Sequence, residues 1–158
     1  ITAFAPLAGR YPHWELVVLG EGPLRAVLQA QIDAAELQQR VFLPGRAGNI
    51  GQWYESADLY VMSSRFEGFP NTLVEALAYG LPAVSFDCDT GPRDLIRHEV
   101  DGLLVAAGDV AGLTAALDRL MGDAALRQRF AERAVEARER FSMERIAGLW
   151  EALFEELR

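Results

Sequence analysis

The chain has 158 residues, of which 51% are hydrophobic and 24% charged, and this composition predicts one globular domain with a sizeable core. A formal net charge of −8 argues against nucleic acid as a partner, because nucleic-acid binding depends on clustered cations. No apolar run reaches the roughly 18 residues that a membrane span needs, and Cys88 is the only cysteine, so we expect a cytoplasmic protein without disulfides.

Short apolar runs alternate along the chain with longer segments of helical spacing, the pattern of a parallel sheet with crossover helices on both faces. The continuous hydrophobicity of the runs is typical of strands that are buried on both sides. We predict strands at residues 16–19, 41–43, 59–62, 83–86 and 103–105. The sequence therefore predicts an α/β, Rossmann-like fold.

Helical spacing recurs between these strands. One predicted helix covers residues 24–35, a short one contains Trp53 and Tyr54, and a third begins at residues 71–73. Gly80 is expected to end the third helix, because glycine readily takes the left-handed conformation found after helix ends. The three helices supply the crossovers that a parallel sheet requires.

The segment from Val110 onward is predicted to be helical in three pieces. Glu136 and Arg140 are spaced to pair across one helical turn. Apolar residues between positions 146 and 157 form a single stripe that includes Trp150. We expect this C-terminal helical segment to pack against another part of a larger protein.

The start of the chain departs from this architecture. Ile1, Phe4 and Ala8 are spaced like the end of a helix, whereas a doubly wound domain opens with a strand. We therefore expect residues 1–158 to form a single domain whose first strand lies upstream of residue 1.

The segment EGFPNTLVE holds the strongest chemical signal, because Glu67 and Glu75 bracket a loop that turns into a helix. Gly68 has no Cβ, so the backbone beside it can approach a ligand closely. Asn71 is a suitable cap for the helix, whose first N–H groups attract an anion such as a diphosphate. Glu75 can accept two neighbouring hydroxyls through its two oxygens. The segment predicts a site for a ligand that is both anionic and polyhydroxylated.

Four stretches of the sequence together resemble one enzyme family. They are LVVLGEGP at 16–23, VFLPGR at 41–46, SADLYVMSSRFEGFPNTLVEALAYGLPAV at 56–84, and DCDTGPRDLI followed by DGLLV at 87–105. These stretches resemble the group 1, or family 4, retaining glycosyltransferases, and in particular the C-terminal donor-binding half of their two-domain GT-B fold. The third stretch is the most specific, because it combines both glutamates of EGFPNTLVE with glycines and prolines in the expected places.

The resemblance implies transfer of a hexosyl group from a nucleotide diphosphate sugar to a hydroxyl acceptor, with retention, in bacterial polysaccharide or glycoconjugate synthesis. It implies Glu67 as the catalytic residue beside the transferred sugar, where it would stabilise developing positive charge, and Glu75 as the ribose ligand. The other substrate-binding residues that it implies are Gly68, Phe69, Pro70, Asn71, Thr72, Leu73, Gly45, Arg46, Gly20 and Gly22. No metal or other cofactor is expected.

Other interpretations remain open. Asp87 and Asp89 form the Asp, any, Asp pattern with which other glycosyltransferases hold Mg²⁺ or Mn²⁺ against a diphosphate. A non-catalytic module that only holds a nucleotide or a protein partner could use the same helix N-terminus. A nicotinamide or flavin site is disfavoured, because Arg25 occupies the third glycine position after Gly20 and Gly22.

The resemblance also implies parts that lie outside this sequence or are missing from it. Members carry an Arg and a Lys just after the first strand that clamp the donor diphosphate, whereas every basic side chain here is an arginine. Arg10, Arg46 or Arg65 could substitute in part. An N-terminal domain would bind the acceptor across a cleft, in a parent protein that could be peripheral at the inner membrane. We expect residues 1–158 alone to bind donor weakly or undetectably and to be inactive.

Overall fold

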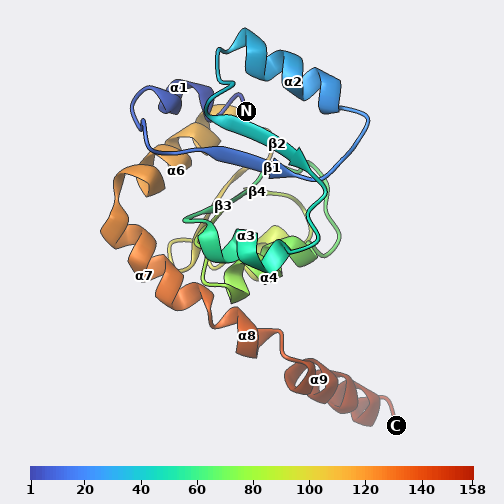
Figure 1. Cartoon of the computed structure of the whole chain (residues 1–158). Coiled ribbons are helices and arrows are strands. Elements are labelled where there is room, and N and C mark those ends of the chain that lie inside the picture. The colour runs from blue at the N-terminus through green and yellow to red at the C-terminus, as the bar shows by residue number, and fades with distance from the viewer.

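The computed structural model describes residues 1–158 and shows an α/β fold in which every pair of neighbouring strands is parallel. The strands are β1 (Leu16–Leu19), β2 (Val41–Gly45), β3 (Tyr60–Met62), β4 (Ala83–Asp87) and β5 (Gly102–Ala106). All five lie where the apolar runs predicted them, within two residues at each end (Figure 1).

The helices alternate with the strands up to β5, and the remainder of the chain is helical. They are α1 (Ala5–Ala8), α2 (Arg25–Ala34), α3 (Ile50–Ser56), α4 (Asn71–Ala78), α5 (Pro92–Leu95), α6 (Val110–Gly122), α7 (Ala124–Ala134), α8 (Ala137–Arg140) and α9 (Met143–Glu156). The C-terminal segment therefore holds four helices and not the three that we predicted. Three of them begin at capped positions, since Asp109, Asp123 and Ser142 each accept a hydrogen bond from a backbone N–H three residues later.

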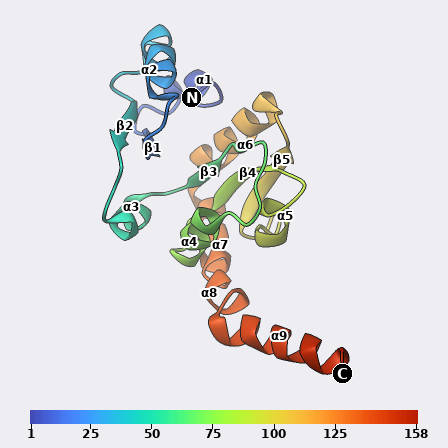
Figure 2. The ribbon, with the colours of Figure 1, turned by 90° about the vertical axis from the view of Figure 1, so that its right-hand side faces the viewer.

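The strands form two sheets and not one continuous sheet, with β1 paired to β2 and with the order β3-β4-β5 in the other. In Figures 1 and 2, β1 lies between β2 and the three-stranded sheet, and the edges of β1 and β3 that face away from their partners are unpaired. The prediction of strands buried on both faces is correct for β4 and wrong for β1, where Val17 and Val18 are each 37% exposed.

Helices cover both faces of the three-stranded sheet. Successive side chains of β4 point to opposite faces: Val84 belongs to a core cluster with Leu117 of α6, whereas Ala83 belongs to a second cluster with Leu73 and Leu77 of α4. The first cluster also contains buried residues of α1, α2 and β2, so it joins the two sheets. Helix α4 is thus anchored by its buried face to the sheet.

The helix α9 is the exception to this packing, because none of its residues is buried. It extends away from the rest of the chain in both views (Figures 1 and 2). Trp150 and Phe154 stack on each other with their ring centroids 5.8 Å apart, and more than half of each side chain is exposed. The predicted apolar stripe therefore faces solvent here.

The predicted pairing of Glu136 with Arg140 is wrong. Glu136 instead accepts from Arg97 at 2.6 Å and forms an ion pair with Arg133 at 2.9 Å. Arg140 turns to Asp101, a carboxylate with no exposed surface that also accepts from the backbone and side chain of Arg97. Arg97 and Asp101, which are distant in sequence, thus replace the helical pairing, and the buried Asp101 requires the cations that surround it.

Candidate functional site

The loop between β3 and α4 carries the motif EGFPNTLVE. As predicted, α4 begins at Asn71, but Asn71 isn't its cap: Pro70 occupies the N-cap position and no side chain caps the helix. The carbonyl of Pro70 accepts from the N–H groups of Leu73 and Val74. The N–H groups of Asn71 and Thr72 make no hydrogen bond within the chain, so they are available at the positive end of the helix dipole.

The two glutamates of the motif differ in exposure, and a tyrosine, Tyr60, lies beside the start of α4. Glu67 lies half-buried in the loop and Glu75 is exposed on α4. Burial raises the pKa of Tyr60, a hydrogen bond with Thr72 lowers it, and the negative charges of Glu67 and Glu75 raise it further. The phenol oxygen of Tyr60 lies 2.8 Å from Thr72 Oγ1, beside the start of α4.

Glu67 lines a cavity of about 350 Å³ between the β3–α4 loop and the loops that follow β4 and β5. The other residues that line it are Arg65, Phe66, Cys88, Asp89, Thr90, Ala107 and Gly108. Two hydrogen bonds join the β3–α4 and β4–α5 loops, from Thr90 Oγ1 to the carbonyl of Glu67 and from Cys88 Sγ to the carbonyl of Ser64. The cavity brings an arginine and a glutamate together, while Glu75 lies outside its lining.

The glycine that this loop requires is Gly91 and not Gly68. Gly68 has no left-handed φ, and a Cβ there would meet no atom within 4 Å. Gly91 has a φ of +93°, and a Cβ there would lie 2.8 Å from the carbonyl oxygen of Gly68 and 2.7 Å from Pro70 Cδ. Gly91 therefore lets the two loops approach closely. The feature of the sequence that marks Gly91 is the Gly-Pro pair at the start of α5, which lies in a different loop from the motif.

The remaining residues of the motif divide by exposure. Asn71 and Thr72 are exposed, whereas Pro70 and Leu73 are buried, so the structure doesn't place Pro70 or Leu73 where a ligand could contact them directly. Phe69 is 56% exposed, and its ring packs edge-on against Phe141 at a centroid distance of 6.1 Å. The exposed groups at this end of α4 are thus the polar side chains of Asn71 and Thr72, their free N–H groups and part of the Phe69 ring.

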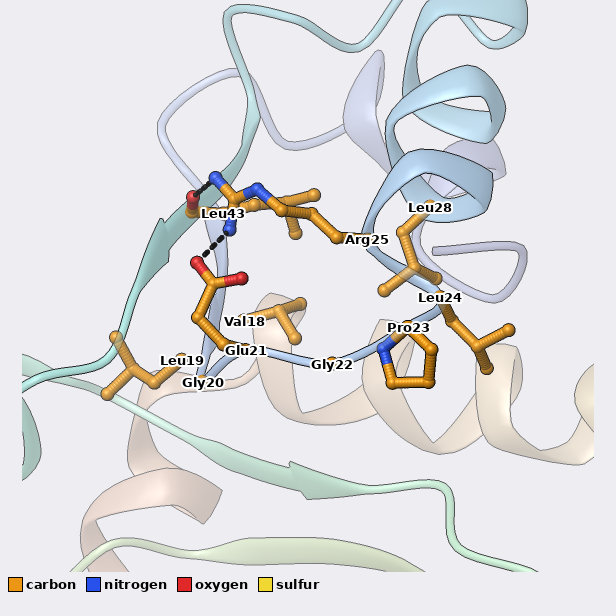
Figure 3. A pocket seen from close by; sticks show the side chains of 10 residues that line it. All are labelled: Val18, Leu19, Gly20, Glu21, Gly22, Pro23, Leu24, Arg25, Leu28 and Leu43. Carbon is orange, nitrogen blue, oxygen red and sulfur yellow. Dashed lines mark hydrogen bonds and ion pairs between the residues drawn. The ribbon is translucent and has the colours of Figure 1, made fainter.

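The predicted residues at the ends of β1 and β2 form a second group. Gly20 donates its N–H to the carbonyl of Gly45 at 2.8 Å, and both glycines have a positive φ. Beside them lies a cavity of about 300 Å³ (Figure 3), lined by Val18, Leu19, Gly20, Glu21, Gly22, Pro23, Leu24, Arg25, Leu28 and Leu43. Arg46 is exposed and outside this lining.

Arg25 holds the rim of this second cavity in place. Its guanidinium donates to Glu21 Oε1 at 2.8 Å and to the carbonyl of Leu43 at 2.6 Å, as Figure 3 shows. Arg25, which stands where a dinucleotide-binding pattern would have its third glycine, thus links the β1–α2 loop to β2. Helix α2 starts only at Arg25, and Leu24 and Val27 are mostly exposed, so the predicted apolar face of 24–35 is buried only around Ile32.

Some of the charged residues named for a metal site or for a diphosphate clamp are already paired with other side chains. Both carboxylate oxygens of Asp87 accept from Arg93, at 2.8 and 3.1 Å, and no group of three His, Cys, Asp or Glu side chains could hold a metal ion. Arg10 pairs with Asp118 on α6 at 2.8 Å. Arg46 and Arg65 form no ion pair, and Arg65 shares a cavity with Glu67. No helix of the chain is long and apolar enough to cross a membrane.

Known proteins share the sequence pattern and the fold of this chain. The family described as "Glycosyl transferases group 1" matches residues 1–137. An exopolysaccharide phosphotransferase from Streptomyces coelicolor is 41% identical over 158 residues, which are 99% of this chain and 17% of that protein. The amylovoran biosynthesis glycosyltransferase AmsD from Erwinia amylovora is 34% identical over 137 residues, which are 87% of this chain and 38% of that protein.

A solved structure is similar along nearly the whole chain. It is a mutant of TarM from S. aureus in complex with fondaparinux, alpha-GlcNAc-glycerol and UDP. The TM-score is 0.89 at 25% identity, and the match covers 96% of this chain and 31% of TarM. The chain thus spans well under half of each protein named in these comparisons.

Proposed function

The chain belongs to the group 1 glycosyltransferases, and from this premise we propose that it is the donor-binding domain of a retaining, family 4 enzyme. Its α/β fold is Rossmann-like and matches the C-terminal domains of GT-B glycosyltransferases. The proposed reaction transfers a hexosyl group from a nucleotide diphosphate sugar to a hydroxyl acceptor, in the cytoplasmic synthesis of a bacterial polysaccharide or glycoconjugate.

One observation carries this proposal: two free N–H groups begin α4, and a carboxylate stands on either side of them in the sequence. The N–H groups of Asn71 and Thr72 are suited to a diphosphate, because they are unpaired and lie at the positive end of the helix. Glu75 follows one turn later and would accept the ribose hydroxyls. Bound UDP in the similar TarM structure supports a nucleotide diphosphate as the ligand class.

Glu67 is the proposed catalytic residue. It would stabilise the positive charge that develops at the anomeric carbon as the bond to the diphosphate loosens. We don't assign it a covalent bond to the sugar. The leaving diphosphate gains negative charge at the same time, and the start of α4 would stabilise it together with Arg65, which lines the same cavity as Glu67. No metal is part of this mechanism, and the arginine pairing of Asp87 supports that choice.

The nucleoside would extend toward the ends of β1 and β2. There, Gly20 and Gly22 line a cavity whose other lining residues are largely aliphatic, Gly45 lies buried at the end of β2, and Arg46 follows on the surface. A flat base fits such a lining, because it offers apolar contact to the ring and backbone groups to its edge. The helix α3, which follows β2 and contacts α4 through Tyr54, connects this part of the site with Glu75.

We also propose that the domain is completed by one more strand between β1 and β3. Both of these strands have an unpaired edge, and side chains of each pack against the same core cluster. A strand in that place would give the doubly wound order typical of nucleotide-binding sheets. We propose that it precedes residue 1 in the whole protein, and that an N-terminal acceptor-binding domain precedes it in turn. Residues 1–158 alone should then bind donor poorly and transfer nothing.

A non-catalytic module is the alternative that shares the most features, since it would use the same helix terminus. The family membership favours the enzyme, and a test of turnover in the whole protein separates the two. The phosphotransferase activity in the name of the Streptomyces relative isn't transferred to this chain, because the match covers 17% of that protein.

A calorimetric titration tests the proposed ligand. The sample is the protein together with any residues that its gene encodes before Ile1. Uridine, guanosine and adenosine diphosphate sugars are titrated into it one at a time. One of them should bind, and Glu75→Ala should weaken it about tenfold or more, as expected for loss of a charged hydrogen-bonding group. The matched control is Glu55→Ala, which removes an exposed glutamate from α3. Equal affinity in wild type and Glu75→Ala would refute the ribose assignment, and survival of binding with a chelator supports the metal-free site.

A further inference from the structure

Tyr54 is a buried tyrosine whose polar end reaches the proposed substrate site. It lies on α3 and is 6% exposed, packed in a small cluster with Ala76 and Leu81. Its ring stacks on Tyr79 at a centroid distance of 5.3 Å with a tilt of 32°. A Cβ at Gly51 would come within 2.7 Å of Tyr79 Oη, so α3 and α4 are in close contact here. The position of the Tyr54 phenol is therefore well defined.

The hydroxyl of Tyr54 points at two groups of α4. It donates to Glu75 Oε2 at 3.0 Å and lies 3.3 Å from the carbonyl of Thr72. Burial raises the pKa of Tyr54, and the hydrogen bond with Glu75 raises it further. The hydroxyl therefore keeps its proton at neutral pH and acts as a donor. Tyr54 makes the only hydrogen bond in the chain to this exposed carboxylate.

We propose that Tyr54 is a positioning residue that orients Glu75 for the ribose hydroxyls, a role that rests on the proposed function of Glu75. An exposed glutamate samples several rotamers, and a ligand that needs one of them must offset the lost freedom. With Oε2 oriented by Tyr54, Oε1 stays free for one ribose hydroxyl, and Oε2 keeps a second acceptor site for the other. The carboxylate is thus held ready before the nucleotide binds.

The test compares nucleotides with and without the two ribose hydroxyls. The protein, with any residues that its gene adds, is titrated by NMR with uridine, guanosine and adenosine diphosphate, and the tightest of the three is compared with its 2′,3′-dideoxy analogue. Tyr54→Phe keeps the stacked ring and removes only the hydroxyl. We expect it to weaken the ribonucleotide about tenfold and to leave the dideoxy analogue unchanged. Tyr79→Phe removes a hydroxyl from the same aromatic pair without touching Glu75, and should change neither.

The outcomes separate this inference from the function on which it rests. If wild type binds none of the nucleotides, or shows no preference for the hydroxyls, the ribose role of Glu75 fails and this inference fails with it. If wild type shows the preference and Tyr54→Phe retains it, only the positioning role is overturned. Equal weakening of both nucleotides in Tyr54→Phe would make Tyr54 a packing residue and would also overturn the role.

Discussion

The two sheets of this chain are both built from mainly apolar strands, but these strands are buried to very different extents. In the three-stranded sheet, β4 is paired on both edges and covered on both faces. In the two-stranded sheet, β1 has one paired edge, and its two central valines are each 37% exposed. Strand composition therefore shows which environment a strand suits and not which neighbours it has. An apolar strand with an open edge presents unpaired N–H and C=O groups to which a further strand can pair.

The largest expected effect on stability comes from the buried carboxylate of Asp101, in the half of the chain that contains the three-stranded sheet. Asp101→Ala removes a carboxylate with no exposed surface, so Arg97 and Arg140 each lose one charged acceptor in a buried place. We expect the free energy of unfolding to fall by about 3–5 kcal/mol in urea titrations. In the two-stranded half, Glu21→Gln breaks the half-exposed pair with Arg25 and should cost less than about 1 kcal/mol. Similar losses in both variants would contradict the contrast between the halves.

A matched pair of valines compares the strands themselves. Val84→Ala empties a fully buried position of β4 and should cost about 2–3 kcal/mol, from lost burial and the cavity left behind. Val17→Ala in β1 should cost about 0.5 kcal/mol in the chain alone, because its side chain is partly exposed already. Urea unfolding of both variants is the measurement. A strand added between β1 and β3 should raise the cost of Val17→Ala, and an unchanged cost in the longer protein would speak against that strand.

The smallest effect concerns an exposed ion pair of the three-stranded half. The hydrogen bond from Arg119 lowers the pKa of Glu99. Because the folded-state pKa lies below the unfolded one, the pair contributes stability above the ordinary pKa of a glutamate, and this is lost as the pH falls through the folded-state value. Glu99→Gln should therefore lower stability at neutral pH by less than about 1 kcal/mol and have no effect at strongly acidic pH. Unfolding measured at both pH values checks this, and a constant difference would refute it.

The sequence predicted local features well wherever neighbours along the chain determine them. The five strands, the start of α4 and its end at Gly80, which has a φ of +84°, follow from apolar runs and glycine conformation. The division into two sheets could not be predicted, because it depends on edges far apart in sequence. Glu136 and Arg140 failed to pair for a similar reason, since Arg97 and Asp101 offered closer partners from another part of the chain.

The candidate site shows the same division. The motif correctly predicted a helix beginning at Asn71, but the cap and the required glycine were wrong, because Pro70 and Gly91 determine the loop through contacts that the spacing doesn't reveal. Tyr54 was expected only as part of a short helix, and its bond to Glu75 crosses 21 positions. The roles of the site residues themselves stay predictions until a ligand is bound.

The start of α4 is the proposed binding place of the donor diphosphate, and NMR can follow its backbone amides while the best-binding nucleoside diphosphate is added. The amides of Asn71 and Thr72 should show the largest shifts, because their N–H groups are free to bond the phosphates. Saturable binding that leaves both amides unshifted would refute this placement of the diphosphate.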